Sequence, residues 1–324
     1  MASPNASQPV TGGPPPIDAS ATAPTVVVDQ FRMDFGDRTV IRDLSFTVER
    51  GETFGFLGAN GSGKTTTLRA LLGIYEPTAG RLLVDGQRFN PSRSQLLGYL
   101  PEERGLYKKE PVIDVMVYFG RLKGLSAAAA RQWSMSYLER VGLADQAKLR
   151  VDKCSGGQQQ KIQLGVTIMN QPELLILDEP TKGFDPVNRR LLMDIIGEQR
   201  QAGATIILVT HQMEEVERLC DRVLLLKDGL ARAYGSVTEV QEAFGGTTVK
   251  VAHRAPLPAS PDYRLVAAEG DTYSELALNP GADPARVLAR LVEEGVGVSS
   301  FTPSRRSMDS IFVEIYGAAA AQED

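Results

Sequence analysis

Cysteine and histidine are scarce in this 324-residue chain, which contains two of each. Cys154 and Cys220 are far apart in the sequence and stand in unrelated contexts, so they form neither a metal-ligand spacing nor a disulfide framework. We therefore predict that both are small buried side chains of a protein that resides in a reducing compartment.

Long apolar runs are also missing. The longest uninterrupted run extends only from Val115 to Phe119, whereas a membrane-spanning helix needs roughly 20 apolar residues. No lysine or arginine precedes Arg32 and no apolar stretch follows Met1, which argues against a secretory signal. We expect a cytoplasmic protein whose connection with a membrane is made through a partner.

The chain has no excess of basic residues. It contains 40 acidic and 35 basic side chains, with a formal net charge of -5. This balance argues against a nucleic-acid partner, because such partners usually require a basic face. The apolar content of 42% is typical of a globular protein, and the length suffices for one large or two smaller domains.

The pattern along the chain predicts three regions. Residues 1–24 are rich in Pro, Ala, Ser, Thr and Gly, which is typical of a disordered tail. Next comes a region of mixed strands and helices. A third region begins after Gly245 and Gly246, where prolines are frequent, and we predict a small separate α+β domain over residues 246–317.

The middle region is predicted to contain a sheet and an inserted group of helices. Short strands are expected at 26–28, 40–48, 53–57, 82–85, 94–99 and 223–227. Residues 111–149 have helical periodicity, which places a helical subdomain at about 100–165. The stretches 174–177 and 205–209 are apolar throughout or nearly so, which favours strands of a parallel sheet that is covered on both faces.

Two helices are expected in the last region. One extends from Pro284 to Glu294 and ends at Gly295, since glycine commonly terminates helices. The other begins after Ser307 as its cap and continues through Tyr316.

The sequence Gly-Ala-Asn-Gly-Ser-Gly-Lys-Thr at 58–65, which we call the phosphate loop, matches the complete nucleotide-binding pattern and follows a predicted strand. Its glycines let backbone N–H groups approach phosphates at the start of the next helix. Lys64 is expected to reach the β and γ phosphates, and the Thr65 hydroxyl is expected to bind Mg²⁺. The predicted nucleotide contacts are Gly58, Asn60, Gly61, Gly63, Lys64, Thr65 and Thr66.

Two further groups follow predicted strands. Asp178 and Glu179 come directly after 174–177; Asp178 is a candidate Mg²⁺ ligand, and Glu179 is a candidate to orient or deprotonate an attacking water. His211 follows 205–209, where α/β sheets present ligand-facing residues, and we predict a contact with the γ-phosphate. We interpret His253, in the last region, as structural.

Taken together, these motifs over residues 25–240 resemble the ATP-binding cassette (ABC) ATPases. Ser155, Gly156, Gly157 and Gln158 look like the signature motif of that family, which begins a helix and contacts the nucleotide held by the opposite subunit. By the same resemblance, Asp185 lies in the loop that links the two sites, Phe35 stacks on adenine and His211 is the switch histidine.

The chain departs from the family pattern at three positions. Cys154 stands where leucine usually opens the signature, and Lys161 replaces an arginine, which keeps the charge but loses a bidentate fork. Glu102 stands at the position of the family's glutamine, where its carboxylate is still able to ligate Mg²⁺ and contact the nucleotide. The surrounding segment 99–107 resembles a subset of bacterial sodium- and drug-efflux ATPases that often carry a small C-terminal domain.

This resemblance implies an α/β fold: a P-loop NTPase (RecA-like) core with an antiparallel β subdomain, an inserted helical subdomain and a small C-terminal α+β domain. It implies an Mg²⁺-dependent ATPase subunit of a bacterial exporter, in which two copies sandwich two ATP molecules and drive a separate membrane permease at the inner face of the membrane. The segment near 102–107 is expected to receive that permease.

Two alternatives belong to other functional classes. A soluble cassette ATPase that acts on nucleic acid or the ribosome typically carries two cassettes, long coiled coils or zinc cysteines, which this chain lacks. A regulator that binds ATP without hydrolysing it is disfavoured by the presence of Lys64, Asp178, Glu179 and His211. The transported substrate is not encoded in any of these motifs.

Overall fold

The computed structural model describes residues 23–90, 95–103, 105–244, 248–270, 272–279 and 281–317. The predicted disordered tail lies outside these ranges, apart from its last two residues. Across the described ranges, every helix is too short or too polar to traverse a membrane. The chain forms two compact units that meet in the sequence between Tyr234 and Gly235. The domain limits predicted from the sequence, 25–240 and 246–317, stay predictions, and the compact units divide the chain slightly earlier.

The first unit contains one large mixed sheet with the strand order β4-β1-β2-β9-β8-β3-β7-β6-β5. In its core, β5, β6, β7, β3 and β8 are parallel, whereas β1 pairs antiparallel with β2 and β4. This confirms the predicted parallel core and antiparallel subdomain. The strands are β1 Val26–Phe35, β2 Arg38–Val48, β3 Thr53–Leu57, β4 Ala79–Val84, β5 Leu97–Leu100, β6 Leu174–Asp178, β7 Thr205–Val209, β8 Arg222–Lys227 and β9 Leu230–Ser236.

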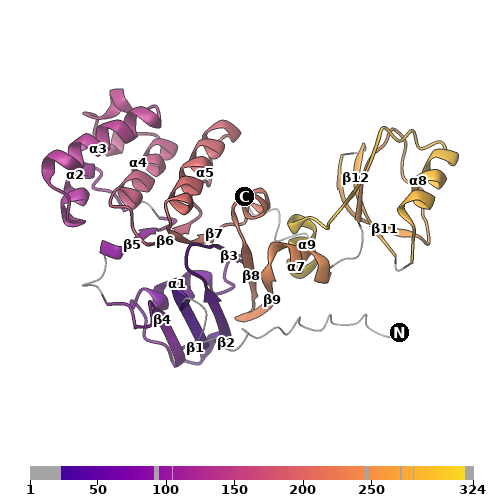
Figure 1. The fold of residues 1–324 in the computed structure, drawn as a ribbon, viewed down its shortest axis with the longest axis horizontal. Coiled ribbons are helices and arrows are strands. Elements are labelled where there is room, and N and C mark those ends of the chain that lie inside the picture. The colour runs from indigo at the N-terminus through magenta and orange to yellow at the C-terminus, as the bar shows by residue number, and fades with distance from the viewer. Residues whose placement is uncertain are drawn as a thin grey trace. The chain divides into compact units, whose positions relative to one another are not determined.

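Helices cover both faces of the parallel strands. Figure 1 shows α4 and α5 on one side of β5, β6 and β7, and α1 on the other side. The helices are α1 Lys64–Leu71, α2 Val112–Leu122, α3 Ala127–Arg140, α4 Gly156–Ile168, α5 Pro186–Gln201 and α6 Met213–Leu219, with 3-10 turns at Ala144–Gln146 and Val151–Lys153.

The two-sided cover explains why β6 and β7 are apolar rather than alternating. Every residue of both strands is buried. Leu175 and Leu177 belong to the core on the side of α4 and α5, whereas Leu174 and Ile176 belong to the core that includes α1. Each such side chain contributes roughly 1.5–3 kcal/mol relative to exposure, so these strands anchor the loops that follow them.

The helical subdomain is confirmed as α2, α3 and α4. Helix α2 buries Val112, Val115 and Met116, the apolar positions that repeat at helical spacing in the sequence. Ser126 caps α3 by accepting from the Ala129 N–H. Tyr137 of α3 is buried against α4, and its hydroxyl donates to the Lys161 carbonyl at 2.8 Å.

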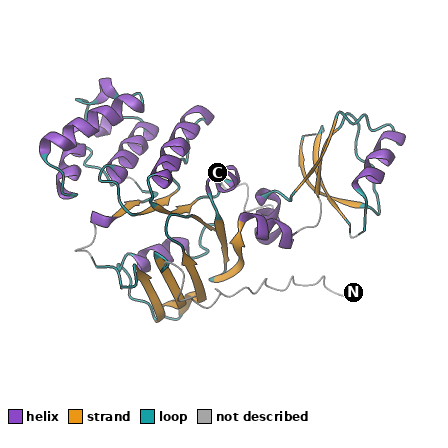
Figure 2. Cartoon of the chain, viewed as in Figure 1, coloured by secondary structure: helices purple, strands orange, loops and turns teal. Residues whose placement is uncertain are grey.

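The second unit contains a four-stranded sheet of order β11-β12-β10-β13 in which all pairs are antiparallel. A helix, α8, covers one face of this sheet (Figure 2). Its Val287 and Leu291 side chains belong to the core that the helix shares with the sheet. Both predicted helices are confirmed, with Ser307 accepting from the Ser310 N–H. The elements are α7 Val237–Phe244, β10 Thr248–Ala252, β11 Tyr263–Glu269, β12 Tyr273–Leu278, α8 Pro284–Glu293, β13 Ser300–Ser304 and α9 Met308–Tyr316.

Arg306 is an ionised side chain buried in this second unit. Its guanidinium donates to the Phe244 carbonyl at the end of α7 at 2.6 Å and pairs with Glu314 of α9 at 2.5 Å. A buried charge needs such partners to offset the loss of water. Arg306 thereby ties α7 to α9.

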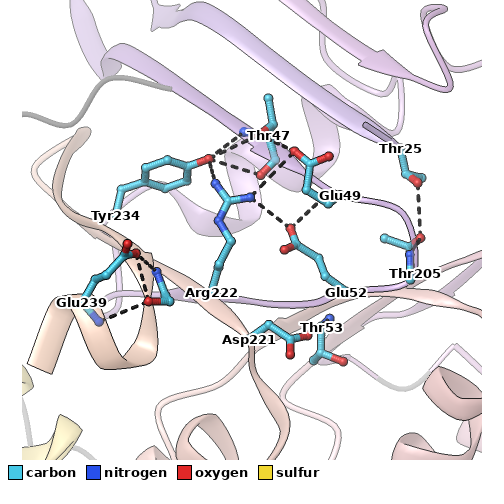
Figure 3. Close-up of polar contacts among 12 residues, drawn as sticks. Thr25, Thr47, Glu49, Glu52, Thr53, Thr205, Asp221, Arg222, Tyr234 and Glu239 are labelled. Carbon is cyan, nitrogen blue, oxygen red and sulfur yellow. Dashed lines mark hydrogen bonds and ion pairs between the residues drawn. The ribbon is translucent and has the colours of Figure 1, made fainter. Parts of the chain in front are cut away.

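A polar cluster stabilises the last strands of the first unit (Figure 3). The Arg222 guanidinium of β8 lies over the Tyr234 ring of β9, 4.8 Å from its centroid, and donates to Glu52 at 3.4 Å. The Tyr234 hydroxyl accepts from the Thr47 N–H of β2 at 3.2 Å. Cation–π contacts of this kind contribute about 0.5–2 kcal/mol, so the cluster holds β8 and β9 to β2.

The packing of α4 on α3 generates a stability prediction. A Cβ on Gly165 would lie 2.4 Å from the Tyr137 ring, so we expect Gly165→Ala to lower the free energy of unfolding by about 1–3 kcal/mol through overpacking. Gly197 of α5 has no atom within 4 Å of a Cβ, so Gly197→Ala should be neutral or raise stability by up to about 1 kcal/mol. Urea denaturation measures both, and equal effects would contradict the packing.

Candidate nucleotide-binding site

The phosphate loop connects β3 with α1, and two of its glycines are sterically required. A Cβ on Gly58 would lie 2.5 Å from the Ser62 hydroxyl oxygen and 2.6 Å from the Leu226 carbonyl oxygen. Gly63 has a φ of 112°, and a Cβ there would lie 2.4 Å from Ile41. Gly63 is also the N-cap of α1 and provides no side-chain cap. The first N–H groups of α1 therefore suit an anion.

Lys64 curls back over this loop. Its ammonium donates to the carbonyl oxygens of Gly58 at 2.5 Å and Ala59 at 3.2 Å. Burial lowers its pKa, while the neighbouring carboxylates Glu179, Asp178 and Glu102 oppose that shift. Lys64 therefore lies inside the loop, and its positive charge interacts with the charges of Glu179, Asp178 and Glu102. Thr65, the next residue, is exposed.

Asp178 at the end of β6 has an unfavourable electrostatic environment. Its carboxyl is largely buried, and burial together with the charges of Glu179 and Glu102 raises its pKa to about 6. Lys64 offsets only part of this.

These residues fit a magnesium ion that is also held by phosphates. No cluster of three or more His, Cys, Asp or Glu side chains with metal-binding geometry occurs among the described residues. Mg²⁺ in nucleotide sites, however, usually takes only one or two carboxylates and completes its shell with water and phosphate oxygens. The Thr65 hydroxyl and the Asp178 and Glu102 carboxylates have the donor chemistry that such an ion would need, and a cation beside Asp178 would relieve the repulsion that, together with burial, raises its pKa.

Glu179 adopts a strained backbone conformation. Its φ is +50°, a region that non-glycine residues rarely occupy and that costs about 1–3 kcal/mol. Its N–H donates to the Val209 carbonyl at 2.8 Å. Its carboxylate lies 2.8 Å from the Nδ1 atom of His211. The structure therefore brings the candidate base and the candidate switch histidine into direct contact, as two adjacent parallel strands end there.

A second, buried carboxylate lies behind this pair. Glu215 of α6 accepts hydrogen bonds from the hydroxyls of Thr181 and Thr210. Burial raises its pKa, and the two hydroxyl donors oppose that shift. The sequence analysis did not select Glu215. The available signal was an acidic residue among the apolar positions of a short helix.

Glu102, the departure from the family's glutamine, has a cationic partner. The Lys182 ammonium lies 3.3 Å from its carboxylate, and both side chains are about half exposed. Such an exposed pair contributes about 0–1 kcal/mol, so it balances charge more than it adds stability. The sequence analysis also missed Lys182, whose proximity depends on the pairing of β5 with β6.

The signature residues form the start of α4. Ser155 is the N-cap, and its hydroxyl accepts from the Gln158 N–H while the Gln158 side chain accepts from the Ser155 N–H. A Cβ on Gly157 would lie 3.1 Å from the Phe184 ring. Ser155 and Gln158 thus cap each other at the start of the helix, and Gly157 leaves little space there for a larger side chain.

Both minor departures in this motif are accommodated. The Cys154 side chain is buried, as expected for a small apolar replacement. Lys161 donates from its ammonium to the Val141 carbonyl at 3.0 Å, which satisfies the end of α3. The lost bidentate fork is replaced by a single helix-capping bond.

Asp185 and Phe35 lie at element ends. The Asp185 carboxylate caps α5 by accepting from the N–H groups of Val187 and Asn188 at 3.0 Å, and these contacts lower its pKa. Phe35 ends β1 with 44% of its surface exposed, and its ring packs edge-on against Tyr75 at 5.3 Å. Its exposed ring is suitable for stacking on a base.

Comparisons with known proteins identify the families to which this chain is similar. Residues 41–182 match the family model "ABC transporter", and residues 235–316 match "ATP-binding protein DrrA1-3-like, C-terminal domain". The chain is 45% identical over 217 residues to the uncharacterized ABC transporter ATP-binding protein MJ1023 of Methanocaldococcus jannaschii, covering 67% of this chain and 79% of that protein.

A second relative covers nearly the whole length. The Nod factor export ATP-binding protein I of Ralstonia nicotianae is 32% identical over 311 residues, covering 94% of this chain and 97% of that protein. Among solved structures, an ATP-binding subunit of an ABC transporter aligns with a TM-score of 0.64 at 28% identity, covering 68% of this chain and 93% of that one.

The environment of Asp178 gives a pH-dependent prediction. Because its pKa rises from the usual 3.8 to about 6 on folding, the native state binds more protons between these values, and stability falls as pH rises through that window. Without nucleotide or Mg²⁺, Asp178→Asn should raise the free energy of unfolding at pH 7 by about 1–3 kcal/mol, with the gain disappearing towards pH 4. Asp145→Asn, at an exposed position, is the control. A gain of equal size at both pH values would contradict the assignment.

Proposed function

This chain belongs to the ATP-binding proteins of ABC transporters, which are ATPases that power transport, and we propose that it energises export as a homodimer bound to a membrane permease. The observation that carries the hydrolysis at the centre of this proposal is the strained Glu179 in contact with His211, beside a lysine whose charge interacts with those of Glu179, Asp178 and Glu102. The work is done at the inner face of the membrane, where ATP is available.

The nucleotide occupies the phosphate loop in this proposal. Backbone N–H groups at Gly58, Asn60, Gly61 and Gly63 and the first turn of α1, with Thr66, surround the phosphates, and Lys64 neutralises them. Phe35 stacks on the adenine. Thr65, Asp178 and Glu102 hold Mg²⁺, which when bound neutralises phosphate charge.

Glu179 orients the attacking water and accepts its proton. Phosphoryl transfer demands mainly positioning and charge neutralisation, so a single well-placed carboxylate suffices. His211 holds that carboxylate through its Nδ1 atom at 2.8 Å. In this proposal His211 also contacts the γ-phosphate. This assignment is supported by the strained backbone at Glu179, because such strain concentrates at functional positions.

A second copy completes each site. The residues Ser155, Gly156, Gly157 and Gln158 at the capped start of α4 contact the nucleotide bound by the partner copy, and Asp185 links the two sites. Val187, two residues after Asp185, has 79% of its surface exposed and is therefore accessible to the partner copy.

The permease binds at an aromatic groove on the helical subdomain. This groove, of about 360 Å³, is lined by Tyr107, Glu110, Asp114, Val115 and Tyr118. The rings of Tyr107 and Tyr118 pack edge-on at 5.4 Å although both are about half exposed. Exposed aromatic pairs with acidic neighbours suit an amphipathic segment of a partner protein.

Export rather than import is supported by similarity. The Ralstonia relative that matches nearly the whole chain is named for export of Nod factor, and the second unit matches a DrrA-like domain. A soluble cassette ATPase that acts on nucleic acid has no observation in its favour, since the chain is acidic overall.

The first test concerns Glu179. Glu179→Gln preserves volume but removes the carboxylate, so it should bind ATP with Mg²⁺, lower the hydrolysis rate by at least ~10²-fold and accumulate an ATP-bound dimer. ATPase assays and size-exclusion chromatography with light scattering measure this. Glu173→Gln, at an exposed carboxylate just before β6, is the control. A Glu179→Gln variant that hydrolyses ATP at the parental rate, or one that remains monomeric with ATP, would refute the corresponding role.

The second test concerns the aromatic groove. Tyr107→Ala combined with Tyr118→Ala should leave ATP hydrolysis by the isolated chain unchanged but abolish co-purification with the permease, because the apolar contact area is lost. Met135→Ala removes an exposed apolar side chain of α3 outside the groove and should leave co-purification intact. Retention of the permease by the double variant would place the docking surface elsewhere.

A further inference from the structure

Glu215 is an acidic side chain with no contact to solvent. Its exposed fraction is 0%, and both carboxylate oxygens accept hydrogen bonds. One oxygen accepts from the Thr181 hydroxyl, and the other accepts from the Thr210 hydroxyl at 3.0 Å. The Thr210 hydroxyl oxygen in turn accepts from the Gln212 N–H at 3.0 Å. Burial of a carboxylate is unfavourable unless hydrogen bonds or opposite charges offset the loss of water.

The two threonines belong to the two loops that carry the candidate catalytic groups. Thr181 lies two residues after Glu179 in the loop that follows β6. Thr210 directly precedes His211 in the loop that follows β7. Glu215 therefore connects the two loops from their buried side.

The loops after β6 and β7 also contact each other on the side that faces the candidate site. The Glu179 carboxylate lies 2.8 Å from His211, and the Glu179 N–H donates to the Val209 carbonyl at 2.8 Å. The left-handed backbone at Glu179 persists only where the surroundings constrain it. The carboxylate of Glu215, held by two hydroxyls, supplies a constraint from behind.

We propose that Glu215 is a positioning residue that sets the geometry of Glu179 and His211 by tying Thr181 to Thr210. It contacts neither reacting group, and its burial keeps it from touching nucleotide. This inference rests on the proposed function, because it assigns Glu215 a role in the hydrolysis attributed to Glu179.

The test compares kcat and KM for Mg²⁺-ATP in the full chain. Glu215→Ala should lower kcat on the order of 10²-fold with KM unchanged, because displacement of a catalytic group by about 1 Å costs that much and the phosphate loop is untouched. Glu215→Gln keeps one acceptor oxygen and should recover part of the loss. Glu214→Gln, at the exposed neighbouring position, is the matched control and should keep the parental kcat.

If Glu215→Ala does not fold, Thr181→Val and Thr210→Val test the same positioning role. Each removes one hydroxyl with little change in shape, and each should lower kcat without changing KM. A folded Glu215→Gln or threonine variant with the parental kcat would overturn the inference. So would a rise in KM without a fall in kcat.

A double variant separates positioning from general destabilisation. If Glu215 acts through Glu179, adding Glu215→Gln to Glu179→Gln should lower the residual rate by a smaller factor than it does in the parent. An equal factor in both backgrounds would overturn the role of Glu215 and leave the proposed function intact. A Glu179→Gln variant that hydrolyses at the parental rate would refute the proposed function, and the role of Glu215 with it.

Discussion

The hydrogen bond between the Glu179 N–H and the Val209 carbonyl is the constraint on which the site depends. It continues the ladder of β6 and β7 by one residue past the end of β6, into a position where the backbone has already turned to a left-handed conformation. The two strands are buried throughout, so they cannot shift to relieve the strain. The core thus holds the carboxylate in a conformation that an isolated loop would leave.

The order of the parallel strands explains why residues that are distant in the sequence lie at one site. Parallel strands place their carboxyl ends along one edge of a sheet, and β5, β6, β7 and β3 are neighbours there. Asp178 ends β6, and Glu102, Glu179 and His211 each lie within two residues after one of these strands. Lys64 follows β3 through the phosphate loop. A change in the order of the strands would separate them without altering any motif.

Patterns within one segment were predictable from the sequence. The strand before the phosphate loop, the apolar strands β6 and β7 and the helix after Ser307 follow from local spacing, propensity and capping, and the structure confirms these elements. The sequence predicted strand β1 only at 26–28, whereas the structure extends it to Phe35, with a register shift against β2 between Val28 and Phe31, where Gln30 has a φ of 49°. The small strands β11 to β13 and helix α7 have weaker local signals, and their packing with the rest of the second unit decides their structure.

The partners of single side chains were not predictable. Lys182 pairs with Glu102, and Glu215 binds Thr181 and Thr210, over separations of 80, 34 and 5 residues. For the short separation the available signal, an acidic residue among the apolar positions of a short helix, also fits an exposed helical position. Such contacts depend on the strand order, which no local pattern encodes.

The charges at this edge of the sheet connect nucleotide binding with assembly. The carboxylates of Asp178, Glu179 and Glu102 act on the cation Lys64. Burial, together with the charges of Glu179 and Glu102, raises the pKa of Asp178. ATP would add further negative charge, which the first turn of α1 and Lys64 offset only in part. In the proposed dimer, Mg²⁺ and the positive N-terminal end of the partner's α4 supply what remains. In this proposal the positive charge of one copy is too small to neutralise bound ATP, so ATP binding favours the dimer. Loss of the γ-phosphate removes negative charge and favours dissociation of the dimer.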